Sequence, residues 1–288
     1  MLFKDFLNFI LHYKIYNHLI RIILSHSTNY KDVNKLKRDT KIVVSLSAEE
    51  DDFDNLEYTL FSIFNQSIPP DNVLLWVSDE YELSDLPYSV TQFIKNGLDV
   101  RFVKYAGSFT KVLYSLKEFK DSIVVIADEN IIYPKNWLAK LYVSYVSNPN
   151  DIHAHTVACV TEDKERIGSV KTWKKFAGME KADYNYFPFE SGGILYPPGC
   201  FIREIFRDDI YSKKVNTSWE IWSWVIALVS GRKIRLVNGH IKRFSSVNII
   251  KTFMKYNKFT GNIKTTDKQL TQLLDYYGNN IFRKFLKK

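Results

Sequence analysis

Cysteine is scarce in this chain, since its 288 residues include only Cys159 and Cys200. Two cysteines are too few for the disulfide framework of a small secreted domain and fit a reducing compartment. Long apolar runs are also missing, because none approaches the roughly 18–20 residues that a membrane-spanning helix needs. His12 and Lys14 interrupt the early apolar stretch where a signal peptide would lie. A cytoplasmic location is therefore expected.

The sequence contains neither a zinc-ligand spacing nor an RNA-binding signature, and it has no internal repeat. Hydrophobic residues make up 45% of the chain and charged residues 25%, which are ordinary values for a globular protein. The net charge of +8 suits nucleic acid, anionic lipid or a phosphorylated ligand. Nucleic acid is the weakest of these three partners because its motifs are absent.

An α/β pattern begins at Lys41. Strands are expected at 41–46, 73–77, 98–103 and 122–126, and helices at about 54–65, 86–96, 108–119 and 135–146, with Asp54 or Asn55 and Pro134 as start signals. Strands that alternate with helices predict a mostly parallel central sheet with right-handed crossovers. Farther along, strands are expected at 152–160, 168–173 and 233–237, and helices at 219–229 and 267–277.

Three regions follow from this pattern: an amphipathic helix and linker at 1–40, an α/β domain at 41–240 and a basic helical extension at 241–288. The apolar face of the first helix consists of Leu2, Phe6, Phe9, Tyr13, Tyr16, Ile20 and Ile23. Such a face binds a membrane surface or packs on the body of the protein or on a partner, and periodicity does not distinguish these.

The acidic triplet Asp128-Glu129-Asn130 directly follows an apolar strand. In an open α/β sheet, ligands bind beyond the carboxyl ends of the strands. The triplet is therefore a candidate site for a metal ion or for a substrate hydroxyl. The alternative is a turn that simply ends the strand.

The order of several motifs resembles one known family. These are Lys41-Ile-Val-Val-Ser-Leu-Ser47, Ile63-Phe-Asn-Gln-Ser-Ile-Pro69, Ala127 to Trp137 with its acidic triplet, and Gly192-Gly-Ile-Leu-Tyr-Pro-Pro198, followed by an acidic residue that opens a Trp-rich helix. The chain from Lys41 to Tyr277 resembles bacterial GT-A-fold glycosyltransferases of the inverting type that build capsule or lipopolysaccharide. Each motif alone is weak, and their order and spacing carry the resemblance.

The resemblance implies transfer of a sugar from a nucleotide-diphosphate sugar to an acceptor hydroxyl on a bacterial surface glycan. A divalent cation, Mn²⁺ or Mg²⁺, would meet the charge that builds on the leaving diphosphate. Asp128, Asn130 and His240 are the implied metal ligands, although a lone His such as His240 is more often a polar surface or packing residue. The family places an aspartate where this chain has Asn130, whose amide oxygen brings no charge.

The donor is expected to contact residues at the ends of the first strands. The implied donor site consists of Ser45, Leu46, Ser47, Asp79, Lys111, Asp128, Glu129 and Asn130. Caps and turn contacts are alternatives for Ser47 and Asp79, and a solvated helix face is one for Lys111. The family carries a Pro and an Arg after the first strand, whereas this chain has Glu49-Glu50-Asp51-Asp52. These acids would repel a diphosphate, and they are expected to face solvent.

The resemblance assigns the general base to Glu220, which would take the proton of the acceptor hydroxyl. The alternative is a capping box over Thr217-Ser-Trp-Glu220, in which the glutamate only satisfies a backbone donor. Trp219 stands where the family has a first acid, and it is read as a stacking residue for sugar or as core. Gly192, Gly193 and Tyr196 are implied in an acceptor-binding wall, with a plain tight turn as the alternative.

Two rival functions remain. The altered triplet and the missing acid before Glu220 also fit a non-catalytic relative that binds or scaffolds a glycosyltransferase complex. A nucleotidyltransferase is less favoured because no glycine-rich phosphate loop follows the first strand. A lipid-linked acceptor would explain basic, amphipathic ends that suit peripheral attachment to the cytoplasmic face of an inner membrane.

Overall fold

The structure is a computed structural model, and it describes residues 31–34, 37–163, 166–176, 181–214, 218–237, 245–246 and 263–278. The amphipathic helix predicted at 1–24, residue His240 and most of the basic extension lie outside these residues.

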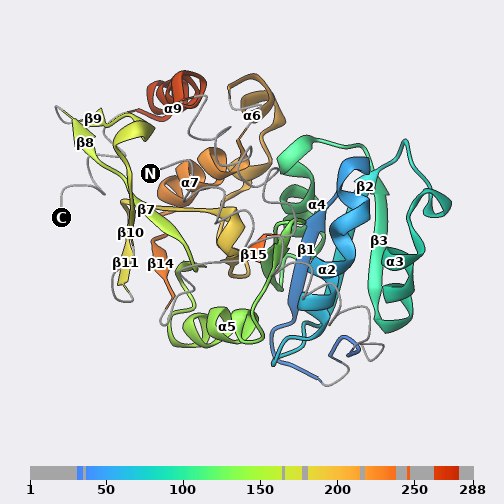
Figure 1. The fold of residues 1–288 in the computed structure, drawn as a ribbon. Helices are drawn as coiled ribbons and strands as arrows, with labels where there is room; N and C mark the ends of the chain where they lie inside the picture. Colours follow the sequence, from blue (N-terminus) through green and yellow to red (C-terminus); the bar gives the residue numbers. More distant parts are fainter. Residues whose placement is uncertain are drawn as a thin grey trace, which may run out of the picture.

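The centre of the molecule is an eight-stranded sheet in the order β11-β14-β6-β13-β4-β1-β2-β3 (Figure 1). Its strands are β1 (Ile42–Ser47), β2 (Asn72–Ser78), β3 (Leu98–Val103), β4 (Ile123–Ile126), β6 (Ile152–Ala154), β11 (Lys181–Asp183), β13 (Ile194–Tyr196) and β14 (Ile234–Leu236). The block β4-β1-β2-β3 is parallel throughout, and β13 pairs antiparallel with both β4 and β6. The predicted mostly parallel central sheet is confirmed.

Helices cover both faces of this sheet, so its central strands are buried on both sides. One core contains side chains from α2 (Phe53–Phe64), α3 (Tyr88–Thr91) and α5 (Trp137–Ser147). The opposite core contains side chains from α4 (Thr110–Glu118), α6 (Asp208–Lys214), α7 (Trp219–Val229) and α9 (Ile263–Tyr277). Runs of Val and Ile suit such strands because both of their faces meet apolar neighbours. None of the described helices combines the length and the apolarity that crossing a membrane requires.

Several predicted boundaries differ from the structure. Helix α2 begins at Phe53, directly after a 3-10 turn at Glu50–Asp52, so the cap predicted at Asp54 or Asn55 is wrong. Helix α5 begins at Trp137 rather than at Pro134, because the Trp137 N–H donates to the Pro134 carbonyl in a preceding turn, at 2.9 Å. Both helices form where they were predicted, but the predicted cap and the predicted first helical position are wrong by a few residues.

The region after β6 (Ile152–Ala154) is broken into short pieces. The strand predicted at 152–160 is split into β6 and β7 (Val157–Cys159), and the strand predicted at 168–173 is wrong, since Val170–Thr172 form a 3-10 turn. Asp267 of α9 accepts hydrogen bonds from the Ser169 hydroxyl at 2.6 Å and from the Val170 N–H at 2.8 Å. A long-range contact therefore holds this turn.

The remaining short strands are β5 (Ile131–Ile132), β8 (Glu162–Asp163), β9 (Arg166–Ile167), β10 (Lys174–Phe176), β12 (Tyr186–Pro188) and β15 (Ser245–Ser246).

The described part of the predicted linker lies on the body of the protein. The Val33 N–H donates to the Asn96 carbonyl at 3.0 Å, and Arg38 forms an ion pair with Asp71 at 2.6 Å. At the other end of the chain, α9 lies beside α6 (Figure 1), and the Tyr277 hydroxyl donates to Glu204 at 2.9 Å. Both described flanks therefore pack on the α/β body.

His153 of β6 makes the stability of this fold sensitive to acid. Its ring is fully buried, with Nδ1 2.9 Å from the Ser144 hydroxyl and Nε2 3.1 Å from the Asn148 carbonyl. The neutral ring satisfies both contacts, and burial lowers the pKa of His153 to about 4. At a pH below the ordinary histidine pKa of about 6.5, His153 binds a proton in the unfolded chain but not in the folded chain. The stability of the fold therefore decreases as the pH falls from about 6.5 toward 4.

We expect the free energy of unfolding to fall by about 2 kcal/mol between pH 7 and pH 5 on account of His153. Urea unfolding of the wild type and of His153→Gln at the two pH values measures this contribution. The variant is expected to lose less stability on acidification than the wild type. An equal loss in both proteins would contradict the assignment to His153.

Candidate functional site

An acidic cluster forms where β4 and β13 come together. Asp128 and Glu129 follow β4, and Glu190 opens a short turn, Glu190–Gly192, that leads into β13. The antiparallel pairing of Ile194 with Ile126 brings this turn beside the carboxyl end of β4. Because β1 runs parallel to β4, the end of β1 lies at the same edge of the sheet.

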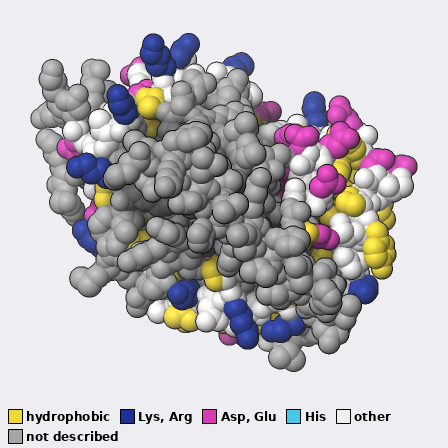
Figure 2. Space-filling model, in the orientation of Figure 1, with side chains coloured by type: hydrophobic (Ala, Val, Ile, Leu, Met, Phe, Trp, Pro, Cys, Tyr) yellow, Lys and Arg dark blue, Asp and Glu magenta, His cyan; other side chains and the backbone are white. Residues whose placement is uncertain are grey.

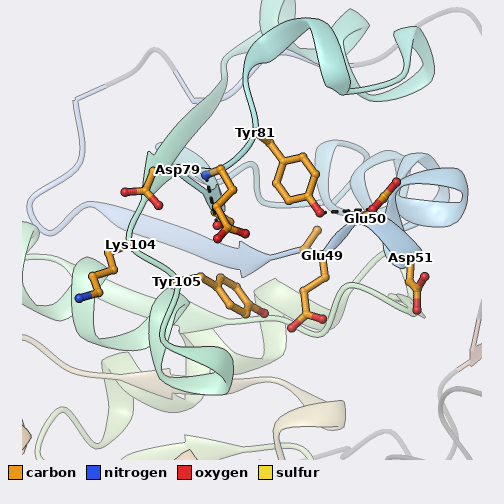
Figure 3. A pocket seen from close by; sticks show the side chains of 10 residues that line it. Glu49, Glu50, Asp51, Asp79, Tyr81, Lys104 and Tyr105 are labelled. Carbon is orange, nitrogen blue, oxygen red and sulfur yellow. Dashed lines mark hydrogen bonds between the residues drawn. The ribbon is translucent and has the colours of Figure 1, made fainter.

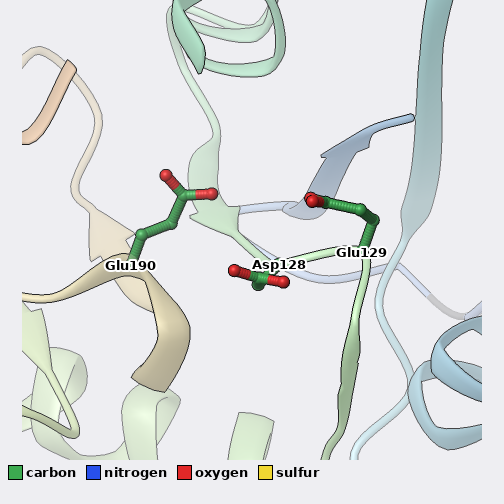
Figure 4. Close-up of side chains that lie close together, drawn as sticks. All are labelled: Asp128, Glu129 and Glu190. Atoms are coloured by element: carbon green, nitrogen blue, oxygen red, sulfur yellow. The ribbon is translucent and has the colours of Figure 1, made fainter. Parts of the chain in front are cut away.

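The three carboxylates of Asp128, Glu129 and Glu190 lie within reach of one shared ion. One carboxylate oxygen from each lies within 4.8 Å of the others. Figure 4 shows the three side chains turned toward a common space. All three are buried, with only 6–7% of their surface exposed. Buried carboxylates are expensive unless they are paired or bind a metal ion, so this cluster needs a positive charge.

Lys111 supplies one positive charge from α4. The side chain is 2% exposed, so the alternative of a solvated helix face is wrong. Its ammonium contacts Glu190 closely, donates to the Ala127 carbonyl at 2.9 Å and lies 3.5 Å from Glu129. The Ser45 hydroxyl donates to the Lys111 carbonyl at 2.8 Å, which ties the start of α4 to β1.

Asn130 connects the cluster to a fourth buried acid, Asp52. Its amide Nδ2 lies 3.1 Å from Asp52 and 3.2 Å from Glu129, and its backbone N–H donates to Asp128 at 2.9 Å. The amide Oδ1 of Asn130 is buried and accepts no hydrogen bond from the part of the chain that the structure describes. A buried amide oxygen without a donor is an available ligand for a hard cation.

Most of the buried charges of the described chain gather in this network. Asp52, Asp128, Glu129 and Glu190 are the buried acids of the described chain, and Lys111 is its one buried Lys or Arg. Four carboxylates and one ammonium thus lie close together in a region shielded from water. Carboxylate and amide oxygens are ligands that suit a divalent cation such as Mg²⁺ or Mn²⁺. The predicted ligands Asp128 and Asn130 both belong to this network.

Two aromatic residues form the floor of the cluster. The Tyr133 hydroxyl accepts a hydrogen bond from the Asp128 N–H at 2.8 Å, and the Tyr133 ring stacks on Trp137 with centroids 4.1 Å apart. Burial, and then the charge of Asp128, raise the pKa of Tyr133 well above its usual value. The Trp137 Nε1–H donates to the Gly192 carbonyl at 2.8 Å, which fixes the turn that carries Glu190.

A pocket of about 680 Å³ adjoins this network at the carboxyl ends of β1, β2 and β3. It is lined by Ala48, Glu49, Glu50, Asp51, Ser78, Asp79, Glu80, Tyr81, Lys104 and Tyr105 (Figure 3). The Glu49 N–H donates to Asp52 at 3.2 Å, so the pocket and the acidic cluster share a wall. Burial, and then a hydrogen bond to Glu49, raise the pKa of Tyr105.

Acidic side chains dominate this pocket. Glu49, Glu50 and Asp51 are exposed, as expected, but they also line the pocket, which the prediction of a solvent-facing loop missed. Tyr81 donates to Glu50 at 3.3 Å across the opening. Figure 2 shows Asp and Glu gathered at the upper end of the lobe that carries β2 and β3, among the described residues of that face. A ligand that enters here meets carboxylates and tyrosine rings.

The other predicted donor residues have mixed surroundings. Asp79 lines the pocket, and Ser47 is buried at the end of β1. Ser45 and Leu46 are completely buried. The Ser45 hydroxyl accepts hydrogen bonds from Trp76 at 2.9 Å and from Ser115 at 2.8 Å, so it joins the sheet to α4.

Two of the predicted acceptor residues, Tyr196 and Trp219, meet at the start of α7. Trp219 is fully buried against Phe109, and its Nε1–H donates to the Tyr196 hydroxyl at 3.3 Å. Glu220 is partly exposed, and Ser218 caps the helix by accepting from the Ile221 N–H at 3.4 Å. Because Ser218 occupies the cap position, the capping box with Glu220 as its closing residue is wrong.

The sequence motifs did not predict that Glu190, Asp52 and Tyr105 belong to the site. Glu190 carries no local motif, since it precedes the glycine pair by two residues and lies far along the chain from Asp128. Asp52 was visible only as one member of an exposed acidic loop. Their roles depend on contacts between segments far apart in the chain, which local sequence features do not reveal.

No protein-family model matches the chain, and a search of curated proteins finds no match. Among solved structures, a mannosyltransferase from Pyrobaculum calidifontis in complex with GDP-Man and Mn²⁺ aligns with a TM-score of 0.41 at 14% identity. The alignment covers 77% of this chain and 61% of that chain, so this chain spans about three fifths of that protein.

Two further structures align over parts of the chain. A 4-diphosphocytidyl-2C-methyl-D-erythritol synthase has a TM-score of 0.39 at 13% identity, with 57% of this chain and 78% of that chain covered. An inositol-1-phosphate CTP transferase from T. maritima has a TM-score of 0.38 at 15% identity, with 69% and 86% covered. At these scores the likenesses assign neither a family nor an activity to this chain.

Proposed function

We propose that this protein is an inverting glycosyltransferase of the GT-A type, which moves a hexose or hexosamine from a nucleotide-diphosphate sugar to an acceptor hydroxyl. The observation that carries the proposal is the buried network of Asp128, Glu129, Glu190 and Lys111 beside a pocket at the strand ends. This arrangement offers a compartment for a nucleoside and, next to it, charged groups for a diphosphate. The sequence motifs found in order along the chain support the same reading.

In this proposal the nucleoside occupies the pocket, with Asp79 available to accept from its base or ribose and Tyr105 beside the entrance to the cluster. Asp128, Glu129, Glu190 and the amide oxygen of Asn130 would hold a divalent cation. That cation, when bound, offsets the negative charge that develops on the departing diphosphate.

Glu220 is proposed as the general base. As the acceptor oxygen attacks the anomeric carbon, the carbon–oxygen bond to the diphosphate breaks on the opposite face, and the Glu220 carboxylate takes the hydroxyl proton. Trp219, the preceding residue, contacts Phe109 of the segment that leads to Lys111 and Tyr196 of the strand that follows Glu190. The start of α7 therefore lies between the two segments that supply the cluster.

The acceptor is proposed to be a surface glycan or its lipid-linked precursor, bound near the Gly192-Gly193 turn and the start of α7. The net charge of +8 would favour attachment to an anionic membrane surface on the cytoplasmic side. Flotation of the full chain with anionic and neutral vesicles measures this attachment.

A non-catalytic binding role is the second candidate. The close contact between Lys111 and Glu190 and the acidic lining of the pocket favour it, because both oppose an incoming diphosphate. Turnover separates the two candidates, since a scaffold would bind its ligand without cleaving it.

A thermal-shift panel of nucleotide sugars, with and without Mn²⁺, tests the proposal. One donor is expected to raise the melting temperature more in the presence of Mn²⁺, and that donor is then expected to be hydrolysed or transferred. A panel in which no nucleotide sugar binds under either condition would reject the transferase.

We expect Asp128→Ala to abolish the Mn²⁺-dependent part of nucleotide binding, because the variant loses a buried ligand of the cluster. Calorimetric titration of the donor nucleotide, with and without Mn²⁺, measures this difference. Asp121→Ala removes a surface carboxylate just before β4 and is the matched control, with binding like the wild type. A normal Mn²⁺ effect in Asp128→Ala would contradict the site.

A further inference from the structure

Positive charge is concentrated in the two flanks of the chain. Residues 41–240 contain 22 Lys or Arg and 27 Asp or Glu, so the α/β domain carries a net negative charge. Residues 1–40 contain 7 basic and 3 acidic residues, and residues 241–288 contain 11 and 2. An anionic surface would therefore repel most of the domain and attract the flanks, above all the second one.

Helix α9 joins this second flank to the surface of the domain. It lies beside α6 (Figure 1) and contacts the 3-10 turn η7 (Arg203–Phe206) that precedes α6. The Tyr277 hydroxyl donates to Glu204 at 2.9 Å, and Arg207 lies 3.6 Å from the same carboxylate oxygen. The basic flank is thus fixed to the η7–α6 segment by a defined set of contacts.

Two large hydrophobic side chains are exposed on the elements that share Glu204. Phe206 of η7 is 39% exposed, and Tyr276 of α9 is 47% exposed. Residues three apart in a 3-10 turn lie on the same side, so the exposed Arg203 lies beside Phe206. The Lys214 ammonium of α6 lies over the Tyr276 ring, 5.3 Å from its centroid. Aromatic and basic side chains therefore occur side by side on what we call the η7–α9 face, which consists of Arg203, Phe206, Lys213, Lys214 and Tyr276.

The acids near this face are partly neutralised. Arg207 lies 2.7 Å from Asp209 as well as 3.6 Å from Glu204, and so it offsets both. Asp208 and Asp275 are further exposed acids of α6 and α9. Together, the segments 203–214 and 263–288 contain ten Lys or Arg and five Asp or Glu, so this corner of the protein has a net positive charge.

The residues that follow α9 have the same chemical character as the face. Only two residues separate Gly278 from the stretch Ile281-Phe-Arg-Lys-Phe-Leu-Lys-Lys288. This stretch consists of four large apolar and four basic residues, without an acid. Apolar side chains enter the boundary between lipid headgroups and acyl chains, and Lys and Arg are attracted to anionic headgroups. The chain therefore continues from the η7–α9 face with a composition that fits a lipid surface.

Helix α7 lies directly behind this face. The Trp222 Nε1–H donates to the Ile205 carbonyl of η7 at 2.9 Å, and the Trp222 ring lies 6.4 Å from the Tyr277 ring. Glu220, the proposed base, lies two positions before Trp222 in the same helix. A lipid-linked acceptor in a membrane that contacts the η7–α9 face would thus be close to the helix that carries the base.

We propose that the η7–α9 face is the membrane-contact surface of this protein and that its partner is an anionic lipid bilayer. Phe206 and Tyr276 enter the headgroup region, and the three cations of the face pair with lipid phosphates. Helix α5, which packs on the opposite side of the sheet, faces away from the bilayer. The inference rests on the membrane attachment in the proposed function and does not depend on sugar transfer.

Flotation of the full chain with vesicles of phosphatidylglycerol and phosphatidylcholine in equal parts, and of phosphatidylcholine alone, tests the proposal. The double variant Phe206→Glu with Tyr276→Glu is expected to bind the anionic vesicles at least about tenfold more weakly than the wild type. Val143→Glu with Val146→Glu is the matched control, since these α5 residues are 61% and 60% exposed. It is expected to bind like the wild type, and melting temperatures show whether each variant is folded.

A second pair of variants changes charge alone and covers the case in which the aromatic variant does not fold. Arg203→Gln with Lys213→Gln removes two exposed cations of the face and is expected to weaken binding to the anionic vesicles at least about tenfold. Lys120→Gln with Lys135→Gln removes two exposed cations outside the face, and it is expected to bind like the wild type.

Wild-type binding in the variants of the face, or an equal loss in the matched controls, would overturn the proposal. So would a wild type that floats with neither kind of vesicle. A wild-type dimer that Phe206→Glu with Tyr276→Glu converts to a monomer in sedimentation, with flotation unchanged, would show that a second copy of the chain occupies the face instead. No nucleotide sugar is present in these measurements, so their failure leaves the transferase standing, and a protein without turnover would still give the expected result.

Discussion

Glu220→Gln is expected to lower the turnover of a nucleotide sugar about 10²–10⁴-fold while leaving the affinity for the donor unchanged. The amide keeps the size of the side chain but cannot take a proton from the acceptor hydroxyl. Ser218 rather than Glu220 caps α7, so the start of the helix should survive the substitution. Steady-state kinetics and calorimetric titration of the donor, measured on the same preparation, separate turnover from binding.

Glu118→Gln provides the control for this measurement. Glu118 is an exposed residue at the end of α4, where it lies 3.4 Å from Arg101, and it has no contact with the cluster in the described structure. Its variant is expected to turn over like the wild type. Near-normal turnover in Glu220→Gln would contradict the assignment of Glu220 as the general base. If the variant also had a lower melting temperature, the role of Glu220 would be structural only.

Gly193→Ala is expected to destabilise the protein by about 2–6 kcal/mol, as the sum of a backbone and a packing penalty. Gly193 has a φ of +83°, a conformation that L side chains rarely adopt. An added Cβ would lie 2.5 Å from Cζ2 of Trp137, whose ring is completely buried and stacked on Tyr133. Neither ring has room to move, so the turn that presents Glu190 would have to shift.

Gly199→Ala separates these two penalties. Gly199 also has a positive φ, of +61°, but an added Cβ would meet nothing within 4 Å. It is expected to lose only about 1–2 kcal/mol, the conformational part alone. Urea unfolding of the two variants gives the packing contribution as their difference. Equal losses would contradict the contact with Trp137.

The pair Gly192-Gly193 shows what a local sequence feature predicts and what it leaves open. Paired glycines indicated a close backbone approach, and the approach is real, but the described partner is the protein itself. Gly192 lies against Thr156 and accepts from Trp137, and Gly193 fits against the Trp137 ring. An acceptor would have to approach this turn from the side that faces away from Thr156 and Trp137.

The helix at Trp219–Val229 and the strand at Leu98–Val103 were predicted to the residue. Both have strong local signals: an apolar run closed by Ser230-Gly231 in the first case and β-branched residues after Gly97 in the second. The short strands after β6 were predicted poorly. Pieces of two or three residues take their conformation from their pairing partners rather than from their own preferences.

By itself, the sequence determined the alternation of strands and helices, because the hydrophobic period and the turn residues act over a few neighbouring positions. It also placed the acidic triplet at the end of β4, since that strand ends where its apolar run ends. Only the tertiary structure decided that Glu190 joins this triplet and that the Lys111 ammonium, expected in the donor site, is buried against Glu129 and Glu190. They reach it from separate segments through the pairing of β13 with β4 and the packing of α4 on β1, and such long-range contacts leave no mark on the residues nearby.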